Sequence, residues 1–245
     1  SEAGMERITS LQNAKVKKWA GLHQKKERDK TGTFLIEGEH LLQEAVRENV
    51  LDTIITDTQP PFYFENVVYV TGDIMKKLSS SVSGTHWIGV AHKPDTKVNL
   101  KGRVLLLDGV QDPGNLGTLI RTAVSFSYDA VYCSKDTVDL YNEKTIRSTQ
   151  GAFLHIPVIY TDLHQVIESL HAQDFTVYAT SLHEAKGMQS ITPKEKMAFI
   201  LGNEGQGVSS GCLKDSDEHL FIEMDGFESL NVAVAGGIVM YHYHI

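Results

Sequence analysis

The most informative segment of this chain is Leu201-Gly-Asn-Glu-Gly-Gln-Gly-Val208, a polar, glycine-rich loop that directly follows an apolar run at 198–201. A second polar segment, Ile222-Glu-Met-Asp-Gly-Phe-Glu-Ser-Leu-Asn-Val232, follows the next apolar run. Glycines and polar side chains at the ends of apolar runs let a chain close around a small ligand instead of filling a core. These two loops are therefore predicted to form a ligand site.

The residues around these loops predict an α/β fold. Short apolar runs recur along the C-terminal part of the chain, separated by segments of helix length, at 104–107, 130–133, 156–160, 176–179, 198–201 and 220–222. Such alternation predicts a largely parallel sheet covered by helices on both faces.

The N-terminal part is predicted to form a smaller α/β unit. Apolar residues near helical spacing predict a helix from 8 to about 26, capped at Thr9 or Ser10, and a second helix at 41–47. Strand-like runs lie at 34–36, 53–56, 67–70 and 86–91. A polar segment with proline and glycine follows, so we expect an N-terminal domain at 5–92, a linker at 93–103 and a C-terminal domain at 104–245.

The composition is that of an ordinary globular protein. The chain has 245 residues, of which 41% are hydrophobic and 22% charged. The longest apolar run, at 232–241, is far shorter than the roughly 20 residues of a membrane helix. No charged-then-apolar signal segment opens the chain, so a cytoplasmic protein is expected. Cys133 and Cys212 lack paired spacing and are expected to be buried thiols.

The charge distribution indicates a polyanionic partner despite a net charge of −8. Residues 7–30 hold eight basic residues against two acidic ones. A basic patch on an acidic protein is a local footprint for a polyanion. The candidate contacts are Lys15, Lys17, Lys18, Lys25, Lys26 and Arg28. The alternative is a solvated helix face without a partner.

A third segment, Leu105-Leu-Leu-Asp-Gly-Val-Gln-Asp-Pro-Gly-Asn-Leu-Gly-Thr-Leu-Ile-Arg-Thr-Ala123, contains a turn followed by a helix. Proline and glycine in the turn predict a helix that begins with Asn115 as its N-cap. Arg121 lies six residues further on, roughly 9 Å along the helix axis, and its side chain leans back toward the cleft of Asn115. Alternatively, Asn115 is only a cap and Arg121 a surface ion-pair partner.

Three other patterns have plain alternatives. The spacing of Gly202, Gly205 and Gly207 could belong to a nucleotide phosphate loop or to a simple turn, because it differs from G-x-G-x-x-G. Ser229 is expected to cap a C-terminal helix whose small residues permit close packing. His242 and His244 have metal-like spacing but no third ligand, so no metal site is expected.

The three segments, in this order and approximate spacing, resemble the SpoU (TrmH-type) RNA ribose 2′-O-methyltransferases of the SPOUT superfamily. The resemblance covers residues 104–241 and, more loosely, 8–92 with the family's ribosomal-protein-like RNA-binding domain. It implies a knotted trefoil arrangement of the parallel-sheet domain, S-adenosylmethionine as cofactor, RNA as substrate and a homodimer. A methyl group on a sulfonium needs orientation and an activated oxygen, not a metal or redox cofactor.

The resemblance also implies roles for residues that match the family's motifs. Asn115, Arg121, Glu204, Ser229 and Asn231 correspond to its catalytic centre. Cofactor contacts correspond to Leu201, Gly202, Asn203, Gly205, Ile222, Met224 and Leu230, and Arg147 in Arg147-Ser-Thr-Gln-Gly-Ala152 to a substrate contact. Two departures affect loop geometry: Glu223 replaces a common proline, and Ala233 a common serine.

We therefore expect methyl transfer to a ribose hydroxyl of RNA, with ribosomal RNA as the expected target and transfer RNA as the alternative. Arginine is nearly always protonated, so Arg121 is expected to hold the target phosphate and stabilise the developing alkoxide, acting across the dimer axis. Its action as a transiently neutral base stays open. Two rivals remain, a non-catalytic RNA-binding protein of this fold and a dinucleotide-dependent oxidoreductase.

Overall fold

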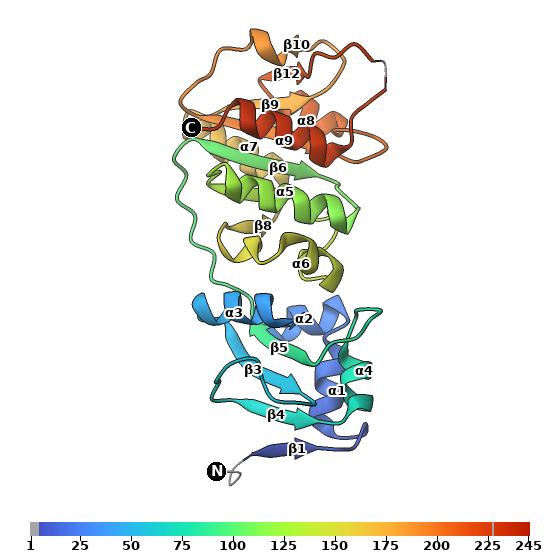
Figure 1. Cartoon of the computed structure of the whole chain (residues 1–245). Coiled ribbons are helices and arrows are strands. Elements are labelled where there is room, and N and C mark those ends of the chain that lie inside the picture. Colours follow the sequence, from blue (N-terminus) through green and yellow to red (C-terminus); the bar gives the residue numbers. More distant parts are fainter. Residues whose placement is uncertain (1–4, 227) are drawn as a thin grey trace. The chain divides into compact units, whose positions relative to one another are not determined.

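The computed structural model describes residues 5–226 and 228–245 and divides into two compact units (Figure 1). The first unit contains the chain up to Asp95 together with Tyr141–Leu154. The second contains Thr96–Leu140 and His155–Ile245. Nothing in the sequence pattern predicts that residues 141–154 belong to the first unit. The domain limits expected above remain a prediction.

The first unit is a five-stranded mixed sheet with helices. The strand order is β1-β4-β3-β5-β2, in which β1 (Glu6–Ile8), β4 (Val67–Val70) and β3 (Leu51–Thr56) run parallel. The strands β5 (Trp87–His92) and β2 (Thr33–Glu37) add antiparallel pairs. Its helices are α1 (Ala14–Gly21), α2 (Lys25–Thr31), α3 (Glu39–Arg47), α4 (Gly72–Leu78) and α6 (Glu143–Thr149).

The prediction of a single helix from 8 to about 26 is wrong. Ile8 belongs to β1, and α1 begins after Asn13, whose side chain accepts a hydrogen bond from the amide of Lys15 at 2.8 Å. A separate α2 follows and ends at Gly32, which has the positive φ of +67° that favours glycine. Apolar spacing alone did not distinguish one helix from a strand followed by two short helices.

An aromatic cluster holds the segment 141–154 in the first unit. The ring of Phe34 on β2 lies 4.7 Å from that of Tyr141 and 5.8 Å from that of Phe153. Phe153 belongs to the short 3-10 helix η1 (Ala152–Leu154). Large aromatic surfaces stabilise such a contact when they are buried together, and both Phe34 and Phe153 are buried.

The second unit confirms the predicted parallel sheet. All seven strands pair in parallel, in the order β10-β12-β9-β11-β6-β7-β8. They are β6 (Arg103–Asp108), β7 (Ala130–Cys133), β8 (Val158–Tyr160), β9 (Thr176–Thr180), β10 (Lys186–Gly187), β11 (Met197–Gly202) and β12 (Glu218–Phe221). The very short β10 was not expected. Both cysteines are free and buried, as predicted.

Helices cover both faces of this sheet (Figure 1). One face packs against α7 (Leu163–Ala172) and α8 (Ser210–Asp215) through alternate strand residues such as Leu106 and Ile200. The other meets α5 (Pro113–Ser125) and α9 (Val232–His242). A Cβ added to Gly236 of α9 would lie 2.4 Å from the side chain of Leu119 on α5 and 2.6 Å from that of Leu201. Small residues therefore allow the predicted close packing of α9.

Hydrogen bonds close the amino-terminal edge of the same sheet. Arg103 is 5% exposed, and its guanidinium donates to the carbonyls of Tyr243, Gly102 and Glu195 at 2.5, 2.7 and 2.9 Å. Burial lowers the pKa of Arg103. A carboxylate oxygen of Asp129 accepts three successive amides, from 101 to 103, at 2.7–2.9 Å. The end of α9 is thereby attached to the start of β6.

Candidate active site

The carboxyl ends of the central strands meet at one edge of the seven-stranded sheet. In the register of β6 and β11, Asp108 lies opposite Gly202, and Thr180 of β9 lies opposite Leu220 of β12. Ligands of open α/β sheets bind beyond this edge. The loops that follow β6, β11 and β12 are the three segments singled out in the sequence.

The loop after β6 leads into α5 with Asp112, not Asn115, as the N-cap. The carboxylate of Asp112 accepts the amide of Asn115 at 2.9 Å, and Pro113 occupies the first helical turn. Proline suits that position because the amide it lacks would have no partner there. Asn115 therefore lies inside the first turn, and its side chain is free to serve the site instead of the cap.

Glu204, in the loop after β11, binds the loop after β6. Its carboxylate accepts the amides of Gln111 at 2.9 Å and Asp112 at 2.7 Å, and the side-chain amide of Asn115 at 3.3 Å. Burial alone would raise the pKa of Glu204, but these donors outweigh it and hold that pKa below the ordinary value. Glu204 is therefore an ionised acceptor that connects two of the three segments.

The shape of the loop after β11 requires glycine at its start. A Cβ on Gly202 would lie 2.1 Å from the backbone carbon of Gly207, because the chain turns back at once. Asn203 and Gly207 exchange backbone hydrogen bonds of 3.0 and 2.9 Å. The side chain of Asn203 accepts the amides of Gly205 and Gln206 and donates to the carbonyl of Gly109, so its polar atoms hold the loop together.

Asn231, not Ser229, is the N-cap of α9. Its side-chain oxygen accepts the amides of Ala233 at 2.8 Å and Val234 at 3.1 Å. Its amide nitrogen donates to the side-chain oxygen of Asn115 at 3.1 Å. The structure thus joins all three segments through Glu204, Asn115 and Asn231, whereas Ser229 lies exposed two residues before the cap.

Arg121 is placed on the same helix as Asn115 but outside this network. It is exposed on α5, and its side chain has no hydrogen bond or ion pair with any other residue that the structure describes. The alternative in which Arg121 serves as a surface ion-pair partner is not realised among these residues. Its guanidinium remains available to an anionic ligand.

The predicted cofactor residues divide into buried and uncovered ones. Leu201 is buried against α9, so its side chain belongs to the core. Met224 and Leu230, in contrast, are 43% and 38% exposed. Uncovered apolar side chains in a loop that follows the carboxyl end of a strand can pack against an adenine ring.

Glu223, which was expected to alter the geometry of this loop, is bound to a neighbouring segment. Its carboxylate accepts the amide of Gln189 at 3.0 Å, and a Cβ on Gly187 would lie 2.6 Å from it. Glu223 thus holds the segment after β12 against the short 3-10 helix η2 (Met188–Ser190).

The end of β9 lies at the same carboxyl edge of the sheet, but the sequence pattern was not used to predict it as part of the site. Thr180 donates its hydroxyl to the carbonyl of Ile200 at 3.0 Å, and the amide of Ser181 donates to the carbonyl of Leu220 at 3.0 Å. The signal was present, since polar residues follow the apolar run at 176–179 just as they follow the two neighbouring strands.

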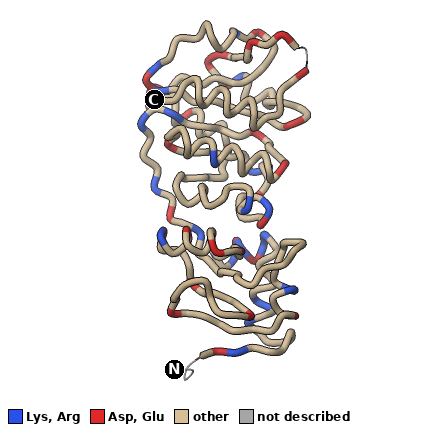
Figure 2. The backbone as a smooth tube through the Cα atoms, viewed as in Figure 1, with Lys and Arg blue, Asp and Glu red and all other residues tan. Residues whose placement is uncertain are grey.

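Of the six basic residues expected to contact RNA in residues 7–30, the structure leaves the five lysines exposed and buries Arg28. Lys17, Lys18 and Lys26 are exposed and have no ion pair among residues 5–226 and 228–245, whereas Lys15 and Lys25 pair with Glu6 and Asp29. Arg28 is only 5% exposed and donates to the carbonyl of Leu22, so it does not lie on this surface with the lysines. Figure 2 shows how the basic and acidic residues are distributed along the backbone.

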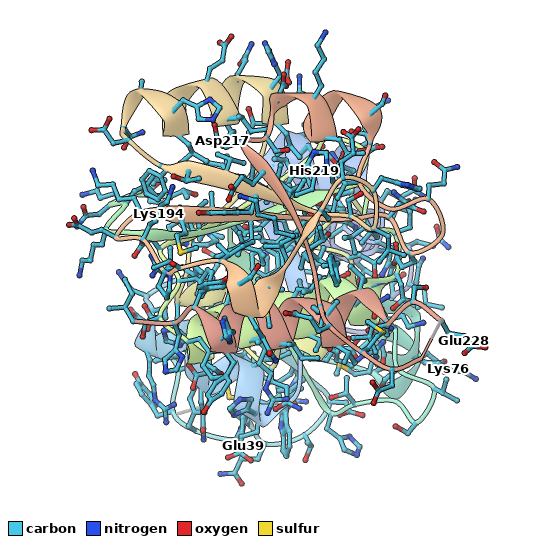
Figure 3. The ribbon with its side chains drawn as sticks, turned by 90° about the horizontal axis from the view of Figure 1, so that it is seen from above. Glu39, Lys76, Lys194, Asp217, His219 and Glu228 are labelled. Atoms are coloured by element: carbon cyan, nitrogen blue, oxygen red, sulfur yellow. The ribbon has the colours of Figure 1, made fainter. Side chains whose placement is uncertain are left out.

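Two further lysines belong to the same unit. Lys76 and Lys77 are exposed on α4, which packs against α1, and Lys76 extends outward in Figure 3. No sequence pattern groups them with residues 7–30, because the two segments are far apart in the chain. Arg147 is exposed on α6, also in the first unit, and is not among the residues that the hydrogen bonds described above bring together.

Neither a metal site nor a membrane helix is found in the part of the chain that the structure describes. Among these residues, no three His, Cys, Asp or Glu side chains are grouped so that they could hold a metal ion. None of the described helices combines the length and apolar character needed to cross a membrane.

Comparisons with known proteins agree with this architecture. The family model described as the SpoU rRNA Methylase family matches residues 102–241, and that of the MRM3-like substrate binding domain matches 13–89. The chain is 42% identical, over 97% of its length and 99% of the relative's, to the 23S rRNA (guanosine(2553)-2'-O)-methyltransferase RlmP of Bacillus subtilis (strain 168).

Solved structures share the whole fold. An AdoMet-bound rRNA methyltransferase from Sinorhizobium meliloti superposes with a TM-score of 0.86 at 26% identity, covering 98% of this chain and 97% of that one. The SpoU methyltransferase AviRb from Streptomyces viridochromogenes, in complex with AdoMet, gives 0.86 at 21% identity over 95% and 97%, a likeness of fold alone.

The chain belongs to the SpoU rRNA methylase family. This confirms the resemblance, the α/β fold class, the enzyme class of RNA ribose methyltransferases and S-adenosylmethionine as the cofactor. The oxidoreductase and the non-catalytic binding protein are thereby set aside.

Proposed function

We propose that this enzyme transfers the methyl group of S-adenosylmethionine to a ribose 2′-hydroxyl of 23S ribosomal RNA. The observation that carries the proposal is the hydrogen-bonded convergence of Glu204, Asn115 and Asn231 from three separate segments. The choice of ribosomal over transfer RNA is supported by the near full-length similarity to an enzyme named for 23S rRNA. A ribosomal substrate also supports the expected cytoplasmic location.

The cofactor fits between the glycine-rich loop and the segment after β12. Exposed Met224 and Leu230 offer apolar surface, and the tight turn from Gly202 to Gly207 brings backbone groups to the carboxyl edge of the sheet. Ile222 and Asn203 complete the set that the family motif assigns, and Thr180 and Ser181 extend it. The bound sulfonium supplies an electrophilic methyl group, so the protein must hold it in line with the ribose oxygen.

Arg121 is the group proposed to act on the substrate. An exposed guanidinium without a partner among the described residues can hold the phosphate of the target nucleotide and stabilise the alkoxide that develops on the ribose oxygen. The proton then leaves to a phosphate oxygen or to water. We assign no proton transfer to Glu204, because its carboxylate is ionised and occupied by three donors.

A homodimer is proposed to complete the site, with Arg121 acting across the two-fold axis. On α9, which packs against the helix of Arg121, Val234, Ile238 and Tyr241 are 51%, 37% and 62% exposed. These residues recur at helical spacing and offer one apolar stripe to a second copy. Light scattering should show a dimer that Ile238→Asp dissociates, together with loss of transfer. A fully active monomer would contradict this arrangement.

We also propose that the C-terminal segment is threaded as the knot typical of the family. The support is the position of α9, which packs on α5 and β11 while its end is bound by Arg103 at the start of β6. The exposed lysines of α1, α2 and α4 are proposed to bind RNA phosphates, as the match to a substrate-binding domain suggests.

The proposed function is tested first by calorimetry with S-adenosylmethionine and then by ribose methylation of RNA. Mass mapping of ribosomal and transfer RNA from cells lacking the protein should reveal one missing 2′-O-methyl group in 23S rRNA. The purified enzyme should restore it on that RNA. Restoration on transfer RNA only would refute the choice of substrate, and no methyl transfer to either would refute the activity.

A further inference from the structure

The side-chain amides of Asn115 and Asn231 are held in a single orientation by groups at the two ends of their hydrogen-bond chain. At one end, the side-chain oxygen of Asn231 accepts the amides of Ala233 and Val234. Backbone amides can only donate, so the oxygen of Asn231 must face the helix. Its nitrogen is then directed to Asn115.

At the other end, Glu204 can only accept. Its carboxylate already receives the amides of Gln111 and Asp112, which favour the ionised form and lower its pKa. An ionised carboxylate offers lone pairs and no hydrogen. The nitrogen of the Asn115 side chain must therefore face Glu204, and its oxygen must face Asn231.

Glu204 and Asn231 both require the same orientation of the Asn115 side-chain amide. Rotating the Asn115 amide by half a turn would set its oxygen against Glu204 and its nitrogen against the nitrogen of Asn231. Two acceptors would then face each other at one end and two donors at the other. In the observed orientation every hydrogen bond joins a donor to an acceptor, and each asparagine keeps one N–H without a partner among the described residues.

We propose that Glu204 and Asn231 are positioning residues that fix the Asn115 amide so that its free N–H is offered to an oxygen of the target ribose or its phosphate. This inference rests on the proposed function. It assigns catalytic contact to Asn115 and makes Asn231 and Glu204 act through it. Preorganised donors of this kind do not have to reorient when charge develops on the oxygen.

Asn231→Asp separates positioning from structural support. Aspartate caps a helix as well as asparagine does, so α9 keeps both of its amide bonds. The carboxylate, however, cannot donate to Asn115, and it invites that amide to turn its nitrogen away from Glu204. We expect kcat to fall on the order of 10²-fold, without a matching decrease in S-adenosylmethionine affinity or thermal stability.

The matched control is Asn142→Asp. Asn142 caps α6 with nearly the same backbone angles, φ −59° and ψ 130° against −51° and 139° at Asn231, and accepts one amide there. Its substitution should leave kcat unchanged. Glu204→Gln provides a second variant, because it keeps the shape of the side chain but replaces one acceptor by a donor.

The double variant Asn231→Asp with Glu204→Gln decides whether the two residues act through one group. If both residues only orient Asn115, the kcat of the double variant should be close to that of the less active single variant. The two fold-decreases should then not multiply. Decreases that multiply, or an Asn231→Asp enzyme with full kcat, would overturn the proposal. A decrease matched by weaker cofactor binding or a lower melting temperature would show a merely structural role.

The wild-type enzyme keeps this test distinct from that of the proposed function. If it transfers no methyl group to any RNA, the proposed function fails, and the positioning role with it. If it is active and Asn231→Asp is equally active, only the positioning role fails.

Discussion

The two edges of the seven-stranded sheet carry hydrogen-bond networks of similar chemistry but different exposure. At the amino edge, the buried Arg103 donates to three carbonyls, and Asp129 accepts three amides. At the carboxyl edge, Asn115 is half-buried and Asn231 exposed, and both keep a free N–H among the described residues. A network in which all these groups are paired within the protein stabilises the fold, whereas a network with free N–H donors can bind a ligand.

The burial of each network determines whether a substitution in it affects stability or turnover. Removing a partner from a buried network leaves desolvated groups unpaired, and this destabilises the fold. An exposed network is destabilised little, because water replaces the missing partner. We therefore expect substitutions at the amino edge to change the free energy of unfolding, and those at the carboxyl edge to change turnover.

The largest expected effect is that of Arg121→Ala. It should lower kcat by on the order of 10²- to 10³-fold, roughly 3–4 kcal/mol, because a donor to the developing oxyanion is removed. Affinity for S-adenosylmethionine and thermal stability should not change, since Arg121 is exposed. Single-turnover methyl transfer measures this, with Arg47→Ala on α3 as the control. Full turnover by Arg121→Ala would refute its role.

Arg103→Met should have the largest effect on stability. It removes three hydrogen bonds from a charged donor and leaves buried carbonyls unpaired, so we expect a destabilisation on the order of 3 kcal/mol. Urea denaturation measures the free energy of unfolding, and Lys101→Met, exposed at the same edge, is the control. If both variants are destabilised equally little, the amino edge does not fasten the chain as described.

The pH dependence of Glu204 gives a smaller effect. Because the folded state lowers its pKa below the ordinary value of 4.5, the contribution of the carboxylate is fully present above that value. It disappears as the pH falls through the lower, folded-state pKa. The difference in unfolding free energy between wild type and Glu204→Gln should therefore shrink below pH 4.5. A difference that grows on acidification would contradict the donor arrangement around Glu204.

The smallest effect per residue is expected for the lysines. Replacing Lys17, Lys18, Lys76 and Lys77 by glutamine should weaken RNA binding and reduce the slope of log affinity against log salt by roughly 0.7–0.9 for each RNA phosphate that is no longer neutralised. Lys194→Gln, exposed near the amino edge (Figure 3), should leave the slope unchanged. Equal slopes for all variants would show that these lysines do not contact RNA phosphates.

Much of the fold and part of the site could be predicted from the sequence. Buried parallel strands appear as apolar runs, so the positions of β6, β7, β9 and β11 were visible, as were the polar loops that follow them. The caps were not predicted correctly. Asp112 and Asn231, not Asn115 and Ser229, cap α5 and α9, because several neighbouring residues could cap each helix and only the backbone angles decide among them.

The sequence by itself determined the family, the sheet and the three polar segments, because strand periodicity and glycine positions are local properties of the chain. The tertiary structure alone decided which polar atoms meet. Glu204 and Asn115 are 89 residues apart, and Asn115 and Asn231 are 116 apart. Such contacts depend on the order and register of parallel strands, which the packing of both sheet faces fixes. Packing also buries Arg28 in the first unit and Arg103 in the second, while Arg121 is left exposed, a distinction that residue type alone does not carry.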